Sequence, residues 1–173
     1  MTDEIQATVD RMAILQLQAA YARGVDRADR ELLRSVYWED ATDDHGSFVG
    51  GGHAFADRLA ERLPQVYAST QHLLGQTWFA SLDSRRALTE TYFRATHAPH
   101  DPAAAGFIIN GRYLDLLEKR GGEWRILRRE LIFDQYFHVA FGRSHIEGQV
   151  YSDRGSLDRS SDFFERMAAD ARA

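Results

Sequence analysis

The stretch YLDLLEKRGGEWRILRR, residues 113–129, decides the fold that the sequence predicts. Two runs rich in aliphatic and aromatic residues flank a pair of glycines, and this pattern indicates a hairpin of two strands, over 107–119 and 124–137. Two further runs of the same texture, over 70–82 and 86–97, are joined by the turn sequence LDSRR. The second half of the chain is therefore predicted to be an antiparallel meander.

Helical patterns come before the meander. Residues 2–23 predict an amphipathic helix that ends at Gly24, which leaves Asp26 in a gap before a second helix over 29–38, with Asp29 as its N-cap. GSFVG is a short strand candidate, and HAFADRLAERL predicts a third helix that Pro64 breaks. Helices followed by a meander indicate the α+β class.

The C-terminal sequence SSDFFERMAADARA predicts a last helix, with Ser160 or Ser161 as its cap. Phe163, Phe164 and Met167 would form its apolar side. We expect this helix to pack on the body of the protein or on a second subunit.

The composition excludes several classes of function. The chain has 173 residues, 44% of them hydrophobic, a net charge of −5 and no cysteine. One core of ordinary size is expected, and thiolate metal sites and cysteine nucleophiles are excluded. Because basic and acidic residues are interspersed and no apolar run approaches the length of a membrane span, we expect a cytoplasmic protein without nucleic-acid or membrane partners.

Two residues stand out as candidates for acid–base chemistry. In the strand that begins near residue 70, alternation places Thr70, His72, Leu74 and Gln76 on one face. A core-facing imidazole needs a polar partner, although such a histidine is more often structural than catalytic. Asp26 is the other candidate, and an aspartate at a helix corner is more often a cap.

A pair of arginines near the end of the chain raises a related question. Arg128 and Arg129 are neighbours on a predicted strand, so only one of them can face the inner surface of the sheet. A buried arginine requires a carboxylate, and Asp26 is a possible partner. The alternative is that both arginines lie in solvent at the edge of the sheet.

These features resemble the SnoaL-like branch of the nuclear-transport-factor-2-like (NTF2-like) superfamily, whose enzymes include scytalone dehydratase and hexachlorocyclohexane dehydrochlorinase. The resemblance covers about residues 5–137. It rests on GVDR after the first helix, a histidine near the start of the first long strand, and the hairpin quoted above. It implies a cone-shaped α+β barrel over residues 1–140, with a curved sheet around an apolar pocket, and a C-terminal extension over 141–173.

The resemblance also implies a site. Asp26 and His72 match a catalytic dyad, and Arg129, with Arg128 as the alternate register, matches an arginine near the dyad aspartate. His97 and Asn110 lie near positions used by scytalone dehydratase. If the opposite face of that strand lines the pocket, Tyr113 and Ile109 replace Asn110.

The expected function is a cofactor-independent lyase. A neutral His72 would take a proton while Asp26 fixes its tautomer, and hydroxide, a halide or a carbon fragment would leave. Tyr21, Tyr92, Ile109 and Tyr113 are expected to bind a hydrophobic, aromatic substrate, and Tyr21 could donate to a developing oxyanion. The alternatives are a non-catalytic binding or association module, and the small subunit of an aromatic-ring dioxygenase.

No cofactor or metal is expected. His97, His100 and Asp101 in HAPHD resemble metal ligands, but a loop interrupted by proline does not present them convergently. GSFVGGG lacks the residues of a phosphate-binding loop. The resemblance implies that the protein forms a homodimer or a homotrimer.

Overall fold

The computed structural model describes residues 3–101, 103–141, 153–154 and 158–170. The helices and strands occur in the following order: α1 (Asp3–Arg27), α2 (Arg30–Ser35), β1 (Tyr37–Asp44), β2 (Val49–Gly51), α3 (Gly52–Val66), β3 (Tyr67–Leu82), β4 (Arg86–Pro99), β5 (Ala105–Arg120), β6 (Glu123–Ala140) and α4 (Arg159–Asp170). The α+β class and the four-strand meander are confirmed.

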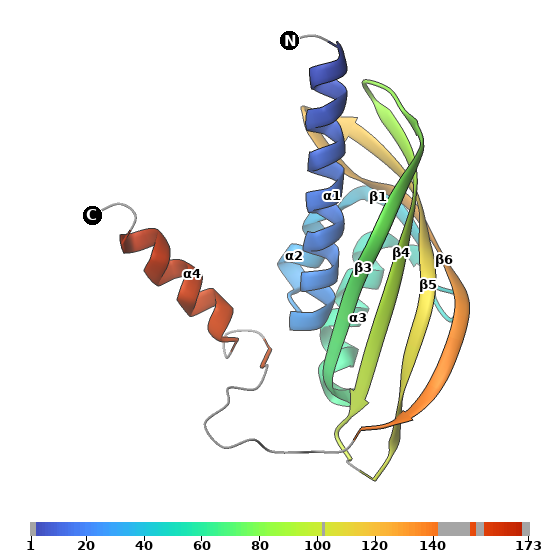
Figure 1. The fold of residues 1–173 in the computed structure, drawn as a ribbon, viewed down its shortest axis with the longest axis vertical. Helices are drawn as coiled ribbons and strands as arrows, with labels where there is room; N and C mark the ends of the chain where they lie inside the picture. Colours follow the sequence, from blue (N-terminus) through green and yellow to red (C-terminus); the bar gives the residue numbers. More distant parts are fainter. Residues whose placement is uncertain (1–2, 102, 142–152, 155–157, 171–173) are drawn as a thin grey trace.

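One strongly curved sheet with the order β2-β1-β6-β5-β4-β3 forms the body of the fold. α1 lies along β3 on the inner side of the curve, with α2, α3 and β1 behind it (Figure 1). The core lies between the helices and the inner face of the sheet, and it includes Ile14, Leu33, Tyr37, Leu117 and Ile126. This is the cone that the family resemblance implies.

The first helix ends later than predicted. α1 continues through Gly24 to Arg27, so Asp26 lies in its last turn and not in a gap. The helix ends where Ala28 adopts a positive φ of 52° and the Asp29 N–H donates to the Gly24 carbonyl. Gly24 serves close packing instead, because a Cβ there would lie 2.9 Å from Leu33 Cγ. Asp29 caps α2 as predicted, by accepting from the Leu32 N–H.

The second predicted helix is too long. α2 ends at Ser35, and the chain then forms β1, which pairs in parallel with β6 and antiparallel with β2. Parallel pairing with a strand so distant in sequence leaves no local signal in the charged stretch of β1. The third helix also differs from its prediction, because α3 runs through Pro64 to Val66. Pro64 falls in the last turn of α3, where its missing N–H removes one helical hydrogen bond and only two residues of the helix follow.

The alternation predicted for β3 holds for its first half. Thr70 is buried, His72 and Leu74 are partly buried, and their neighbours Gln71 and Leu73 are exposed. The register against β4 shifts between Leu74 and Thr77. Gln76 is therefore exposed, and its predicted place on the inner face is wrong.

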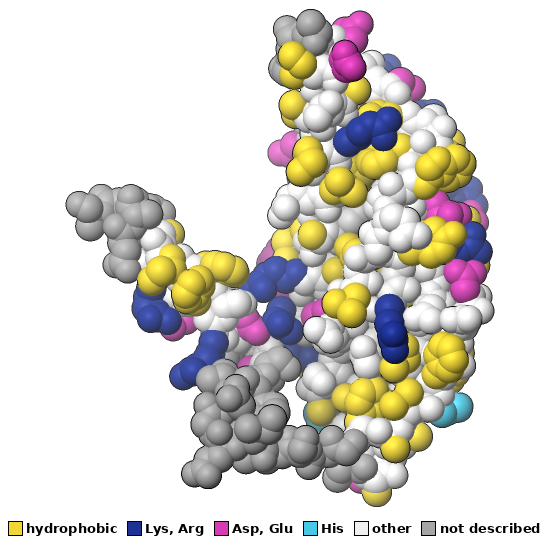
Figure 2. Space-filling model, in the orientation of Figure 1, with side chains coloured by type: hydrophobic (Ala, Val, Ile, Leu, Met, Phe, Trp, Pro, Cys, Tyr) yellow, Lys and Arg dark blue, Asp and Glu magenta, His cyan; other side chains and the backbone are white. Residues whose placement is uncertain are grey.

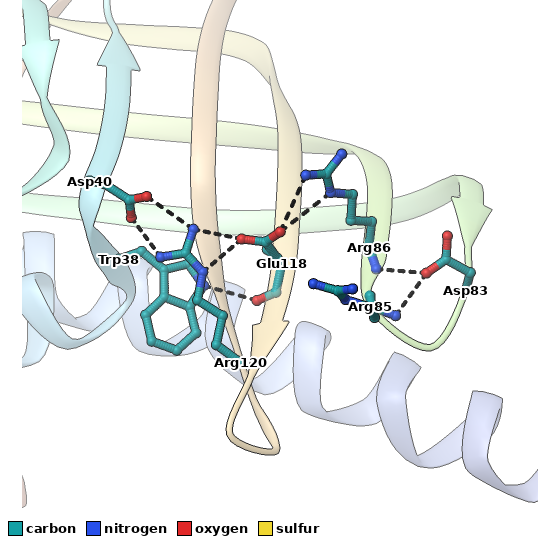
Figure 3. Close-up of polar contacts among 7 residues, drawn as sticks. All are labelled: Trp38, Asp40, Asp83, Arg85, Arg86, Glu118 and Arg120. Carbon is teal, nitrogen blue, oxygen red and sulfur yellow. Dashed lines mark hydrogen bonds and ion pairs between the residues drawn. The ribbon is translucent and has the colours of Figure 1, made fainter.

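A surface network of polar contacts ties the ends of β1, β4 and β5 together (Figure 3). Arg120 pairs with both Asp40 of β1 and Glu118 of β5, and it stacks over Trp38 at 5.0 Å. Arg86 of β4 also reaches Glu118, at 3.3 Å. Because these groups lie near the surface, the network contributes modestly to stability and fixes register.

The C-terminal segment is anchored to the end of α1. Asp158 accepts a hydrogen bond from the Ser160 N–H at 3.0 Å and so caps α4. The prediction that Ser160 caps this helix is therefore wrong. The side chain of Ser161, the alternative cap, lies outside the described residues. Asp158 also pairs with Arg27 at 2.7 Å, and the Arg23 guanidinium donates to the Ser160 hydroxyl.

The rest of α4 projects away from the body (Figure 1) and carries exposed hydrophobic side chains (Figure 2). Phe163, Phe164 and Met167 are all exposed. Arg23 lies over the Phe164 ring at 5.8 Å, which is the contact between this apolar side and α1.

Candidate active site

A pocket of about 270 Å³ opens on the inner face of the sheet. Its walls come from α1, α3, the turn after β1, and the inner residues of β3 to β6. The lining is mostly apolar and aromatic, and includes Val25, Phe55, Leu59, Leu63, Phe93, Phe107, Leu131 and Phe133. The polar side chains among the lining include three histidines, His45, His72 and His97.

Asp26 and His72 are in direct contact at this pocket. The His72 backbone N–H donates to Asp26 Oδ2 at 2.8 Å, and the imidazole Nδ1 lies 2.7 Å from Asp26 Oδ1. Both carboxylate oxygens therefore hold one residue, which fixes the ring. With Nδ1 donating to the carboxylate, Nε2 keeps its lone pair and can accept a proton.

The surroundings of the dyad can stabilise the positive charge that forms on His72 when it accepts a proton. Asp26 lies in the last turn of α1, where the helix dipole is negative, and its carboxylate faces the imidazole. The side chains of Asp26 and His72 are only 13% and 8% exposed, so little water screens the pair. The arrangement can therefore accept a proton at Nε2 and stabilise the imidazolium that forms.

The cation near Asp26 differs from the one expected. Arg129 does not pair with Asp26, because its guanidinium is fully buried and bound to Asp115 through two bonds of 2.7 Å. Arg154 interacts electrostatically with Asp26 and donates to the Thr70 hydroxyl at 3.3 Å. Sequence reasoning missed Arg154, because it reaches the dyad from a C-terminal segment with no local pattern.

Arg129 instead packs against two tyrosines that line the pocket. Its guanidinium also donates to Gln18 Oε1 at 2.6 Å and lies 4.2 Å from the centres of two rings, Tyr21 and Tyr113. Arg128 points the other way and pairs with Glu130 in solvent, so the expectation that only one arginine faces inward is confirmed.

His97 lies in the pocket beside His72, with their rings 5.7 Å apart and at 79° to each other. It stacks on Phe107, and its Nδ1 has no hydrogen-bond partner among the described residues. Burial, with the neighbouring His72, lowers the pKa of His97 to about 3. His97 is therefore a neutral imidazole at physiological pH. Its loop neighbour His100 instead contacts the Pro64 carbonyl, outside the pocket lining.

The predicted substrate residues divide into two groups. Tyr21, Ile109 and Tyr113 line the pocket, and burial raises the pKa of both tyrosines, so they stay protonated. Tyr92 does not line it, because it is exposed on the outer face beside Arg112. Asn110 also points outward and bonds to Gln135.

A second histidine–aspartate pair was missed by sequence reasoning. Asp43 on β1 is buried and binds the Nδ1 of His45, while its other oxygen accepts from the Tyr37 hydroxyl at 2.7 Å. His45 Nε2 lies 3.4 Å from the Tyr21 hydroxyl. The only available signal was the D-x-H spacing, which puts both side chains on one face of a strand.

Among the described residues, no three His, Asp or Glu side chains converge closely enough to hold a metal ion. None of the helices in the described ranges has the length and apolar character that crossing a bilayer requires.

Comparison with known proteins agrees with the geometry. Residues 6–130 match the SnoaL-like domain family. Among curated proteins, none matches the chain. A candidate scytalone dehydratase from Novosphingobium aromaticivorans DSM 12444 is similar in structure, with a TM-score of 0.70, 20% identity, and coverage of 83% of this chain and 97% of that one.

Two hexachlorocyclohexane dehydrochlorinases are also similar in structure. The type 2 LinA gives a TM-score of 0.74 at 19% identity, covering 84% of this chain and 99% of that one. The type 3 LinA from Novosphingobium barchaimii LL02 gives 0.73 at 16% identity, covering 83% and 99%. At these identities the similar structures establish the shared fold, and the family match covers most of the chain. The chain therefore belongs to the SnoaL-like domain family.

Proposed function

We propose that the protein is a cofactor-independent lyase that acts on a small hydrophobic, aromatic substrate. The observation that carries this proposal is the Asp26–His72 contact at the wall of an apolar pocket. A carboxylate that holds Nδ1 leaves Nε2 as a base, and His72 lines a pocket whose walls are mostly apolar. The candidate scytalone dehydratase and the dehydrochlorinases of similar fold are consistent with this chemistry.

The reaction begins when His72 Nε2 takes a proton from the substrate. The proton comes from a carbon next to a carbonyl, or from a hydroxyl in a retro-aldol cleavage. The electron pair left behind forms the new double bond, and the leaving group departs with its own bonding pair. Asp26 stabilises the imidazolium through this step, and the proton later returns to solvent from His72.

The size and lining of the pocket support a substrate with one aromatic ring. An apolar cavity of about 150 Å³ is enough for benzene, so about 270 Å³ accommodates one ring with a short side chain. Arg58 and Arg62 of α3 are exposed and also line the pocket. Their charges would favour a substrate with a carboxylate or a phenolate.

The outer face of the sheet supports association of copies into a homodimer or homotrimer. Leu73, Trp78 and Phe137 are all exposed, and Trp78 is 63% exposed. Apolar surface of this kind marks protein–protein contacts more often than free surface. Light scattering coupled to size exclusion would measure the mass of the assembly, and a monomer at micromolar concentration would contradict this part of the proposal.

The enzyme proposal is tested with a panel of single-ring β-hydroxy ketones, diols and halides. Wild type, His72→Ala and Asp26→Asn are compared by the absorbance of the unsaturated product. We expect turnover by wild type and a fall in kcat/KM of about 10²–10⁴ in His72→Ala, the usual contribution of a general base. The matched control is His138→Gln, an exposed histidine near the end of β6, which should not change the rate. Equal turnover by all four proteins would refute the dyad assignment.

A further inference from the structure

Two buried aspartates flank one buried arginine across three strands of the sheet. Register places Asp115 of β5, Arg129 of β6 and Asp43 of β1 side by side, and all three are buried. The guanidinium of Arg129 donates two hydrogen bonds to Asp115. Among the described residues, Asp43 forms its ion pair with His45.

This row leaves His45 as the basic partner of the buried Asp43 carboxylate. A buried carboxylate is costly unless a cation or several hydrogen bonds compensate it. Asp43 accepts from the Tyr37 hydroxyl and contacts Nδ1 of His45. Because Arg129 donates its hydrogen bonds to Asp115, His45 is the basic side chain that contacts the Asp43 carboxylate.

The other nitrogen of His45, Nε2, lies near a tyrosine that lines the pocket. Nε2 lies 3.4 Å from the Tyr21 hydroxyl, which is long for a hydrogen bond and typical of a contact that shortens when substrate binds. His45 stacks on Phe55, with ring centres 4.1 Å apart, so the imidazole is held in place. Both His45 and Tyr21 line the pocket that His72 also lines.

We propose that Asp43, His45 and Tyr21 form a proton-donating relay that protonates an oxygen leaving group in this pocket. The inference rests on the proposed lyase function and narrows its substrate class to compounds that expel hydroxide or an alkoxide. His72 and His45 would then be the base and the acid of one reaction, each oriented by its own aspartate.

The relay delivers one proton to the leaving group for each proton that His72 takes. His72 takes a proton from the substrate, and the C–O bond breaks with its electron pair on the oxygen. That oxygen takes the proton of the Tyr21 hydroxyl, while Tyr21 takes the proton from Nε2 of His45. Water or an alcohol leaves, Tyr21 remains neutral, and exchange with solvent returns one proton to His45 and removes one from His72.

The coupled transfer is required by the environment of Tyr21. Burial raises the pKa of its phenol, so a lasting phenolate is unfavourable. The guanidinium of Arg129, 4.2 Å from the centre of the Tyr21 ring, stabilises the negative charge that develops on the oxygen in passing. Tyr21 is thus suited to pass a proton on and not to lose one permanently.

The test compares two substrates that differ only in the leaving group: the aldol adduct of benzaldehyde with acetone, and its acetate ester. Both give benzylideneacetone, which absorbs in the near ultraviolet. Acetate leaves without protonation, whereas hydroxide requires an acid. We expect His45→Gln and Tyr21→Phe to lower kcat/KM for the alcohol by a factor of about 10²–10⁴. For the ester, the factor by which kcat/KM falls should be at least ten times smaller.

Each outcome separates the two proposals. Tyr21→Phe keeps the ring on Arg129, so it remains informative even if His45→Gln folds poorly. His72→Ala should lower the rate for both substrates, which reports on the base alone. Equal losses for alcohol and ester in both relay variants, or no loss in either, would overturn the relay while the lyase function stands. A wild-type protein inactive on both substrates would overturn the lyase function and the relay with it.

Discussion

Replacing Arg129 with methionine should destabilise the protein severely. Arg129 is fully buried, donates two bonds to Asp115 and one to Gln18, and stacks between two tyrosine rings. Methionine fills much of the volume but leaves the Asp115 carboxylate buried without its cation. Removing one partner of a buried ion pair costs about 3–5 kcal/mol of unfolding free energy, which is a large part of the stability of an ordinary domain.

Urea unfolding followed by fluorescence measures this free energy. The matched control is Arg128→Met, one residue away, where the side chain is 64% exposed and pairs with Glu130 in solvent. That change should cost less than about 1 kcal/mol. The double variant Arg129→Met/Asp115→Leu removes both charges, so it should be more stable than Arg129→Met alone. A cost below about 1 kcal/mol for Arg129→Met, or no recovery in the double variant, would refute this reading of the buried row.

Three further predictions concern stability. The pKa of His97 falls from its ordinary 6.5 to about 3 on folding, so between these pH values the unfolded chain binds more protons and the protein loses stability as the pH drops. His97→Phe should reduce the pH dependence of the unfolding free energy by about 1.4 kcal/mol per pH unit in urea titrations from about pH 6 to 4. An unchanged pH dependence would contradict this prediction. Gly24→Ala should lower stability by about 1 kcal/mol, because overpacking against Leu33 outweighs the helix propensity of alanine; a more stable variant in thermal melts would show that the contact relaxes freely. Asp29→Ala should cost about 1 kcal/mol by removing the cap of α2, and no change in the melting curve would contradict that role.

Much of the sheet was predictable because its strands pair with their neighbours in sequence. The glycine turn after Arg120 and alternating apolar residues place β3 to β6 correctly. β1 was missed, because its partner β6 is far away in sequence and its own stretch is charged. The end of α1 was placed too early, because Gly24 looked like a stop signal and in fact admits the side chain of Leu33.

The candidate site was predictable only in part. Family resemblance identified Asp26 and His72, and the structure brings them into contact. The carboxylate that holds Arg129 depends on the register of β5 against β6, which places Asp115 opposite it. Arg154 approaches Asp26 from the C-terminal segment. Such partners follow from tertiary packing, and no local sequence pattern specifies them.

The central claim is that His72, held by Asp26, takes a proton from a carbon of the substrate. The most direct measurement is exchange of the acidic hydrogens of phenylacetone, which keeps the carbonyl and lacks a leaving group, in deuterated water by NMR. We predict that wild-type protein catalyses the exchange and that His72→Ala slows it by about 10² or more. Exchange at the same rate in wild type and His72→Ala would contradict the account.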